Sequence, residues 1–132
     1  MLMTPPAPTF GKEERMASRL LIETLFDNGG SRAAAAFPLR VVYRLVERKQ
    51  GSAPAQLLVS VPKRRLKRAV DRNRVKRQIR EAYRHHKQIL WEQIPDGQQA
   101  LVALIWLSDK HCPTNEVERR VAGLLQRIVN RC

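Results

Sequence analysis

Residues 57–90 read LLVSVPKRRLKRAVDRNRVKRQIREAYRHHKQIL, and this stretch decides the fold of the chain. The apolar run 57–61 is typical of a strand, and Pro62 ends it. A short basic linker then leads into a helical pattern from about residue 70 to residue 90. Apolar positions recur along this helix at steps of three and four and predict its buried stripe: Val75, Ile79, Ala82, His86 and Leu90.

Further patterns of both kinds flank this unit. An N-terminal helix has Leu21 and Leu25 on its apolar side, and a glycine pair ends it. Residues 39–46 (LRVVYRLV) predict a strand, and residues 100–107 (ALVALIWL) predict a strand that is buried on both faces. A last helix begins at Thr114, which is expected to cap it. The inner face of that helix consists of Val117, Val121, Leu124, Leu125 and Ile128.

The elements follow in the order helix, strand, strand, helix, strand, helix, and residues 33–36 are ambiguous. Such an order predicts a two-layer α/β (α+β) sandwich, in which helices cover a sheet of three or four strands. A length of 132 residues suits one domain, which we place at residues 10–132. Residues 1–9, MLMTPPAPT, are rich in proline and predict a flexible tail.

The charge of the chain is concentrated on one element. Lys and Arg number 25 against 12 Asp and Glu, so the net charge is +13. Residues 63–87 hold 12 basic and 2 acidic side chains and account for +10 of that charge. Self-repulsion at this density costs stability and therefore indicates a polyanionic partner. Nucleic acid is the first choice, and an anionic membrane surface is the second.

The same sequence disfavours several other classes of protein. The longest apolar run is far shorter than the roughly 20 residues that span a membrane, and we see no secretory signal peptide. Cys112 and Cys132 lie far apart without metal or redox spacing, which fits a reducing cytoplasm. Paired carboxylates, a Ser/His/Asp signature and metal-ligand spacing are missing from the sequence. Structural roles are therefore expected for the histidines: His85, His86 and His111.

The exposed face of the long helix is expected to carry the binding. Four basic residues follow one another at steps of four and predict an exposed ridge: Arg72, Lys76, Arg80 and Arg84. Asn73 and Arg77 form a parallel row. Arginine can hold a phosphate bidentately and stack on a base, and asparagine can contact a base edge or a ribose. An ordinary solvated face is the alternative, but Asp71 and Glu81 are too few acids to neutralise these arginines.

Residues 61–84 resemble the hallmark segment of the bacterial ribonuclease P protein subunit. That family carries a basic pair soon after a strand, a short linker, an Arg-Asn-Arg core and then Lys-Arg and Arg-Glu pairs. All of these are present, as Lys63-Arg64, Arg72-Asn73-Arg74, Lys76-Arg77 and Arg80-Glu81. An N-terminal helix that ends in Phe26-Asp27-Asn28-Gly29 extends the resemblance, which spans about residues 10 to 128.

The resemblance implies the sandwich fold of a ribosomal protein domain, with a left-handed βαβ crossover that departs from the usual preference. It also implies that the chain is the non-catalytic part of an endoribonuclease, whose catalytic RNA removes the 5′ leader of precursor tRNA. The protein would bind this RNA and the leader. It would hold no cofactor of its own, because the Mg²⁺ of the holoenzyme acts through the RNA. The expected particle is cytoplasmic, with neither a membrane nor a DNA partner.

Two binding surfaces follow from the resemblance. The surface toward the catalytic RNA would comprise Lys63, Arg64, Arg68, Arg72, Asn73, Arg74, Lys76, Arg77, Arg80 and Arg84. The second surface is a cleft between the first helix and the sheet, in which an unpaired leader would stack on aromatic side chains beside an electropositive wall. Its candidates are Ile22, Phe26, Phe37, Arg40 and Tyr43.

Several of these cleft candidates have a competing reading. Phe26, Phe37, Arg40 and Tyr43 could each serve the core instead, because an aromatic side chain at regular spacing is packing by default. Ile22 stands where many members of the family have an aromatic residue, and this departure predicts weaker base stacking there. Both tryptophans are assigned to packing: Trp91 and Trp106.

Two other functions fit the sequence less well. A ribosomal or other structured-RNA protein would need the positive charge but not this order of residues. A nuclease in its own right would need clustered acids to hold a metal ion, whereas the acids of this chain are scattered.

Overall fold

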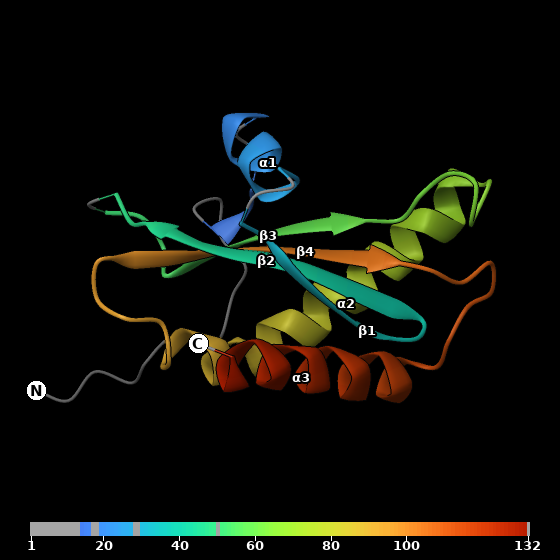
Figure 1. Ribbon diagram of the computed structural model, residues 1–132. Coiled ribbons are helices and arrows are strands. Elements are labelled where there is room, and N and C mark those ends of the chain that lie inside the picture. The colour runs from blue at the N-terminus through green and yellow to red at the C-terminus, as the bar shows by residue number, and fades with distance from the viewer. Residues whose placement is uncertain (1–13, 17–18, 28–29, 50, 132) are drawn as a thin grey trace, which may run out of the picture.

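The computed structural model describes residues 14–16, 19–27, 30–49 and 51–131 and has the predicted mixed α and β composition (Figure 1). Its elements are α1 (Arg19–Leu25), β1 (Arg32–Ala36), β2 (Leu39–Glu47), β3 (Ala55–Ser60), α2 (Ala69–Trp91), β4 (Gln98–Trp106) and α3 (Thr114–Asn130). The predicted helices and strands are thus confirmed, and the ambiguous residues 33–36 belong to a strand. The predicted tail, residues 1–9, lies outside the described residues.

The strands form one sheet in the order β1-β2-β4-β3. β1 pairs antiparallel with β2, β2 pairs antiparallel with β4, and β3 pairs parallel with β4. A parallel pair needs a long connection, and here α2 supplies it. The segment quoted at the outset is therefore the first two parts of a β3-α2-β4 crossover, whose handedness stays a prediction.

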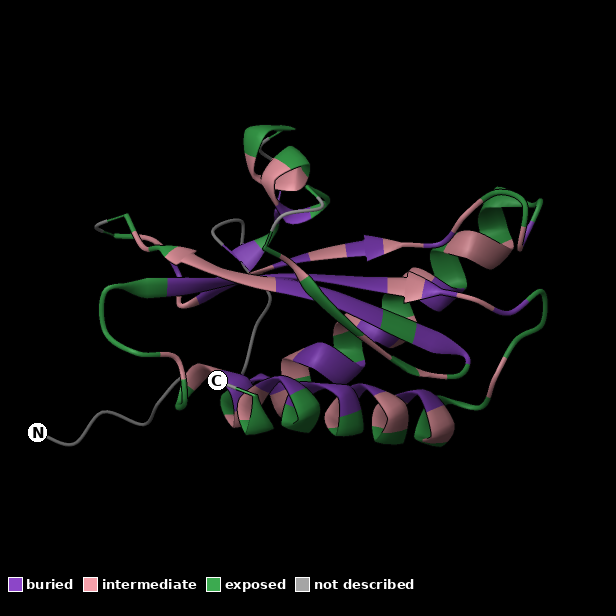
Figure 2. Ribbon diagram, in the orientation of Figure 1, coloured by how far each residue is buried: buried purple, intermediate pink, exposed green. Residues whose placement is uncertain are grey.

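Helices cover both faces of the sheet: α2 and α3 lie on one side and α1 on the other (Figure 1). Because side chains alternate along a strand, Leu39, Val41 and Tyr43 of β2 point toward α2 and α3. Val42 points toward α1 and packs there with Leu25. Residues 99–104 of β4 are all buried, which confirms the prediction of a strand buried on both faces (Figure 2).

α2 buries a wider stripe than its sequence pattern predicts. Four of the five predicted positions are fully buried: Val75, Ile79, Ala82 and Leu90. His86 is half-buried instead and hydrogen-bonds through Nε2 to Glu118 of α3 at 2.8 Å. Tyr83 and Lys87 are buried in addition, the latter through an ion pair with Glu14. The buried side of the long helix therefore packs against the sheet, α3 and the segment around residue 14.

α3 has the predicted inner face, and all five of its positions are buried: Val117, Val121, Leu124, Leu125 and Ile128. The prediction that Thr114 caps this helix is wrong. Pro113 occupies the N-cap position, and no side chain forms a cap hydrogen bond. The Thr114 hydroxyl instead accepts a hydrogen bond from Gln78 Nε2 at 3.2 Å, so this residue joins α3 to α2.

Candidate RNA-binding surface

The outer face of α2 presents a row of exposed polar side chains without acidic partners. Asn73, Arg74 and Arg77 are exposed, and within the described ranges their side chains make no hydrogen bond or ion pair. Their spacing of three and four residues places them side by side on the helix. Because no carboxylate occupies these guanidinium groups, their donors are available to phosphate oxygens.

The neighbouring row was predicted as an exposed ridge, but it is half-buried: Arg72, Lys76, Arg80 and Arg84. Arg72 Nη1 donates hydrogen bonds to the carbonyl oxygens of Leu66 at 3.0 Å and Lys67 at 2.7 Å, so that it braces the linker before α2. Burial, together with the charge of Arg15, lowers the pKa of Arg80. Helical spacing places Arg80 and Arg84 beside Tyr83 and Lys87, which are buried.

Arg84, the last member of that row, is already occupied by a carboxylate. Its Nη2 and Nε donate to Oε2 of Glu81 at 2.6 Å and 3.0 Å. This hydrogen bond holds the pKa of the Glu81 carboxyl below its usual range. Arg84 therefore offers less to an external anion than Arg77 does.

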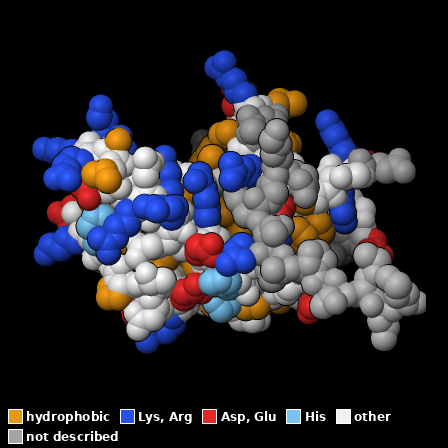
Figure 3. Space-filling model, turned by 180° about the vertical axis from the view of Figure 1, so that it is seen from behind, with side chains coloured by type: hydrophobic (Ala, Val, Ile, Leu, Met, Phe, Trp, Pro, Cys, Tyr) orange, Lys and Arg blue, Asp and Glu red, His pale blue; other side chains and the backbone are white. Residues whose placement is uncertain are grey.

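The linker between β3 and α2 extends the exposed basic surface. Lys63, Arg64 and Arg68 are all exposed, as the resemblance requires of residues that contact RNA. Arg68 occupies the N-cap position of α2, where no side chain forms a cap hydrogen bond, so the helix dipole adds positive potential. Figure 3 shows Lys and Arg side chains gathered over the linker and the first part of α2, at the left of that view.

A hollow of about 250 Å³ lies between α1 and the sheet, and we call it the α1 hollow. Its lining includes Leu25, Phe26, Ser31, Arg32, Arg40 and Val42. Phe26 is 46% exposed and follows the last turn of α1, while Arg40 projects from β2 on the same face. Two of the five cleft candidates thus meet, one aromatic and one cationic. Sequence reasoning did not select Arg32, because the residues after it were ambiguous and hid the strand.

The other three cleft candidates lie elsewhere. Ile22 is half-buried and packs against the core on the α1 side of the sheet. Phe37 is 65% exposed in the turn between β1 and β2, outside the lining of the α1 hollow. Tyr43 cannot share this hollow, because strand alternation turns its side chain to the opposite face, where it is 95% buried against the core of α2 and α3.

The histidines take structural positions at the junction of α2 and α3. His85 Nδ1 and His86 Nε2 each lie 2.8 Å from a carboxylate oxygen of Glu118. His111 Nε2 lies 3.1 Å from Asp71 Oδ1 at the other end of the junction. No group of three or more His, Cys, Asp or Glu side chains that could hold a metal ion occurs among the described residues. The same residues include no helix long and apolar enough to cross a membrane.

Comparison with known proteins connects this chain to a family. The family model for ribonuclease P matches residues 10–129. The chain belongs to the ribonuclease P protein family. It is 45% identical over 129 residues to the ribonuclease P protein component of Porphyromonas gingivalis, covering 96% of this chain and 91% of that protein. The ribonuclease P protein component of Chlorobium phaeobacteroides is 36% identical over 125 residues, which cover 89% and 86% of the two chains.

Solved structures of ribonuclease P proteins share the fold. The Staphylococcus aureus protein superposes with a TM-score of 0.66 at 20% identity and covers 87% of this chain and 94% of its own. The Thermotoga maritima protein gives a TM-score of 0.64 at 22% identity, with 86% and 96% covered. This chain thus has the same sandwich fold as these two proteins, although about four-fifths of the residues differ.

Proposed function

We propose that the protein assembles with the RNA subunit of ribonuclease P and assists removal of the 5′ leader from precursor tRNA. Family membership supports a role in a ribonuclease holoenzyme. The observation that carries the proposal is the exposed row on α2, in which Asn73, Arg74 and Arg77 have no partner within the described chain. Such a row matches a densely charged RNA backbone.

In this proposal the RNA performs the hydrolysis and the protein positions the substrate. Mg²⁺ would act at phosphate oxygens held by the RNA, as a Lewis acid and as a source of hydroxide. The side chains of this protein would hold RNA phosphates through α2 and the linker, while the α1 hollow receives the unpaired leader. There Phe26 would stack on a base and Arg40 would face the leader backbone. The assembled particle would be cytoplasmic.

Cleavage of a precursor tRNA by a bacterial ribonuclease P RNA at low Mg²⁺, with and without the protein, tests this function. We expect the protein to stimulate cleavage at the mature 5′ end and to cut nothing alone. Binding of the RNA without stimulation would instead favour the structured-RNA protein considered above. Cutting by the protein alone would overturn the assignment of catalysis to the RNA.

A further inference from the structure

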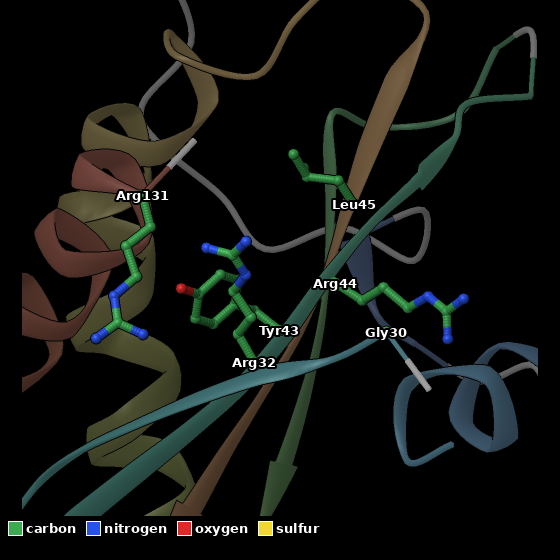
Figure 4. A pocket seen from close by; sticks show the side chains of 6 residues that line it. All are labelled: Gly30, Arg32, Tyr43, Arg44, Leu45 and Arg131. Atoms are coloured by element: carbon green, nitrogen blue, oxygen red, sulfur yellow. The ribbon is translucent and has the colours of Figure 1, made fainter. Parts of the chain in front are cut away.

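A second hollow, of about 260 Å³, lies at the end of the edge strand β1 (Figure 4). We call it the edge hollow, and its lining consists of Gly30, Arg32, Tyr43, Arg44, Leu45 and Arg131. β1 begins at Arg32, which pairs with Tyr43, whereas β2 continues to Glu47. The edge hollow therefore lies where β2 extends beyond its pairing with β1, beside the C-terminal end of α3.

Positive charge dominates this hollow. Three of its six lining residues are arginines and none is acidic. Arg44 points to the α1 side and donates a hydrogen bond from Nη1 to the carbonyl oxygen of Thr24 at 3.1 Å. Arg32 and Arg131 are exposed, and their side chains bond to no other group in the part of the chain that the structure describes. Two guanidinium groups are thus left with their donors free.

The tyrosine adds a third donor. Tyr43 is 95% buried, yet its hydroxyl has no hydrogen-bond partner among the described residues. A buried hydroxyl is normally satisfied, because leaving it unpaired costs free energy. Figure 4 shows Tyr43, Arg32 and Arg131 on the same side of the sheet, away from Arg44. A ligand that accepts hydrogen bonds from a phenol and from two guanidinium groups would be an anion.

The volume of the edge hollow and its position indicate that this anion is a phosphodiester. The volume is close to that of the α1 hollow and below the roughly 300 Å³ at which pockets for small molecules and cofactors begin, so the edge hollow suits part of one nucleotide. Arg32 lines both the edge hollow and the α1 hollow, so the two are adjacent across the start of β1. A single-stranded RNA that leaves the α1 hollow past Arg32 therefore enters the edge hollow.

We propose that the single-stranded leader runs from the α1 hollow across the start of β1 and places a phosphate between Arg32, Arg131 and the Tyr43 hydroxyl. This inference rests on the proposed function, because it uses the α1 hollow as the first leader site. It adds a second leader subsite on the other face of the edge strand. Short leaders end before this subsite, and only longer leaders reach it.

Leader length gives the test. We would measure the affinity of the reconstituted holoenzyme for precursor tRNAs whose leaders increase in length, with the wild-type protein, Arg131→Ala and Tyr43→Phe. Arg131→Ala should weaken binding of long leaders severalfold and leave short leaders unchanged. Loss of one contact to a single-strand phosphate should also lower the slope of log affinity against log salt by about 0.7, for long leaders only. Tyr43→Phe, which keeps the ring, should reduce long-leader affinity in the same direction.

Arg119→Ala is the matched control, because it removes one exposed positive charge from α3 outside the edge hollow and leaves Glu116 paired with Arg120. Arg119→Ala should change the affinity for neither short-leader nor long-leader precursor tRNAs. Arg131 also complements the negative end of the α3 dipole, but that role would appear in the melting temperature and not in the dependence on leader length.

Three results would overturn the subsite: no effect of Arg131→Ala on long leaders, equal weakening of short and long leaders, or weaker assembly with the RNA subunit in the absence of substrate. Failure of the wild-type protein to stimulate cleavage of any precursor would refute the proposed function instead. The two failures are therefore distinguishable in one set of reactions.

Discussion

At the scale of single residues, burial separates two kinds of arginine on α2. Arg77 is exposed and bonds to no other described side chain, whereas Arg84 is half-buried and bound to Glu81. Arg72 belongs with Arg84, because its guanidinium already satisfies carbonyl oxygens of the linker. The same residue type on the same helix is therefore available to a partner in one position and already bonded within the fold in another.

Arg77→Ala should weaken assembly with the RNA subunit and lower the salt slope of binding by about 1, because one phosphate contact is lost. Arg84→Ala should change affinity much less, since its charge is already compensated by Glu81. Salt titrations of the two variants against the wild-type protein measure both effects. Equal losses of RNA affinity from Arg77→Ala and Arg84→Ala would show that the ion pair between Arg84 and Glu81 does not make these two arginines differ in RNA binding.

Phe26→Ala should reduce the affinity of the holoenzyme for precursor tRNA by about 1–3 kcal/mol, the range for one stacked base. Binding of mature tRNA, which has no leader, should stay unchanged. Leu20→Ala is the control, because Leu20 is 70% exposed on α1 and does not line the α1 hollow. An equal effect of both substitutions would indicate that α1 acts through its general packing.

At the scale of elements, the C-terminal half of α2 is held by a buried polar cluster. Lys87 Nζ lies 2.7 Å from Glu14 Oε1 and 4.5 Å from the centre of the Trp91 ring. Trp91 Nε1 donates to the hydroxyl of Tyr83 at 3.1 Å, and burial raises the pKa of that hydroxyl. The cluster fastens the segment around residue 14 to α2, next to the backbone hydrogen bond from Met16 to Leu57 of β3.

Breaking this ion pair should destabilise the protein strongly. Glu14→Gln leaves the Lys87 ammonium buried without its counter-charge, and we expect a loss of about 3–5 kcal/mol in the free energy of unfolding. Arg19→Ala is the comparison, because it removes one partner of an exposed ion pair with Glu23 and should cost at most about 1 kcal/mol. Urea denaturation of both variants measures these energies. A loss below 1 kcal/mol for Glu14→Gln would mean that water reaches the pair.

At the scale of the whole molecule, a net charge of +13 makes the free protein repel itself. Raising the ionic strength from about 0.1 M to about 1 M shortens the Debye length from about 10 Å to about 3 Å. The free protein should therefore gain thermal stability over this range, while its affinity for RNA falls through counterion release. Calorimetric melting and equilibrium binding in the same buffers measure the two trends. A melting temperature and an RNA affinity that both rise or both fall with salt would contradict the view that RNA supplies the missing negative charge.

Much of the fold followed from local patterns. Val75 and Ile79 are buried because apolar residues at helical spacing share one face, and residues 39–46 form a strand because branched and aromatic residues suit a pleated surface. The short run of alanines after Arg32 has no such signal, and its strand depends on pairing with β2. The tertiary context therefore supplied β1, and with it the edge on which both hollows lie.

The candidate sites divide in the same way. Positive charge on the linker and α2, and the order of residues that marks the family, are properties of the sequence itself. Contacts between distant segments decided which charged side chains are paired and which line the two hollows. Glu14 pairs with Lys87, Arg40 lines the α1 hollow together with Phe26, and Arg131 lines the edge hollow together with Arg32. The physical reason is the distance along the chain over which each effect acts. Helical and strand periodicity arise from the backbone within a few residues, whereas burial and pairing depend on which surfaces the completed sheet brings together.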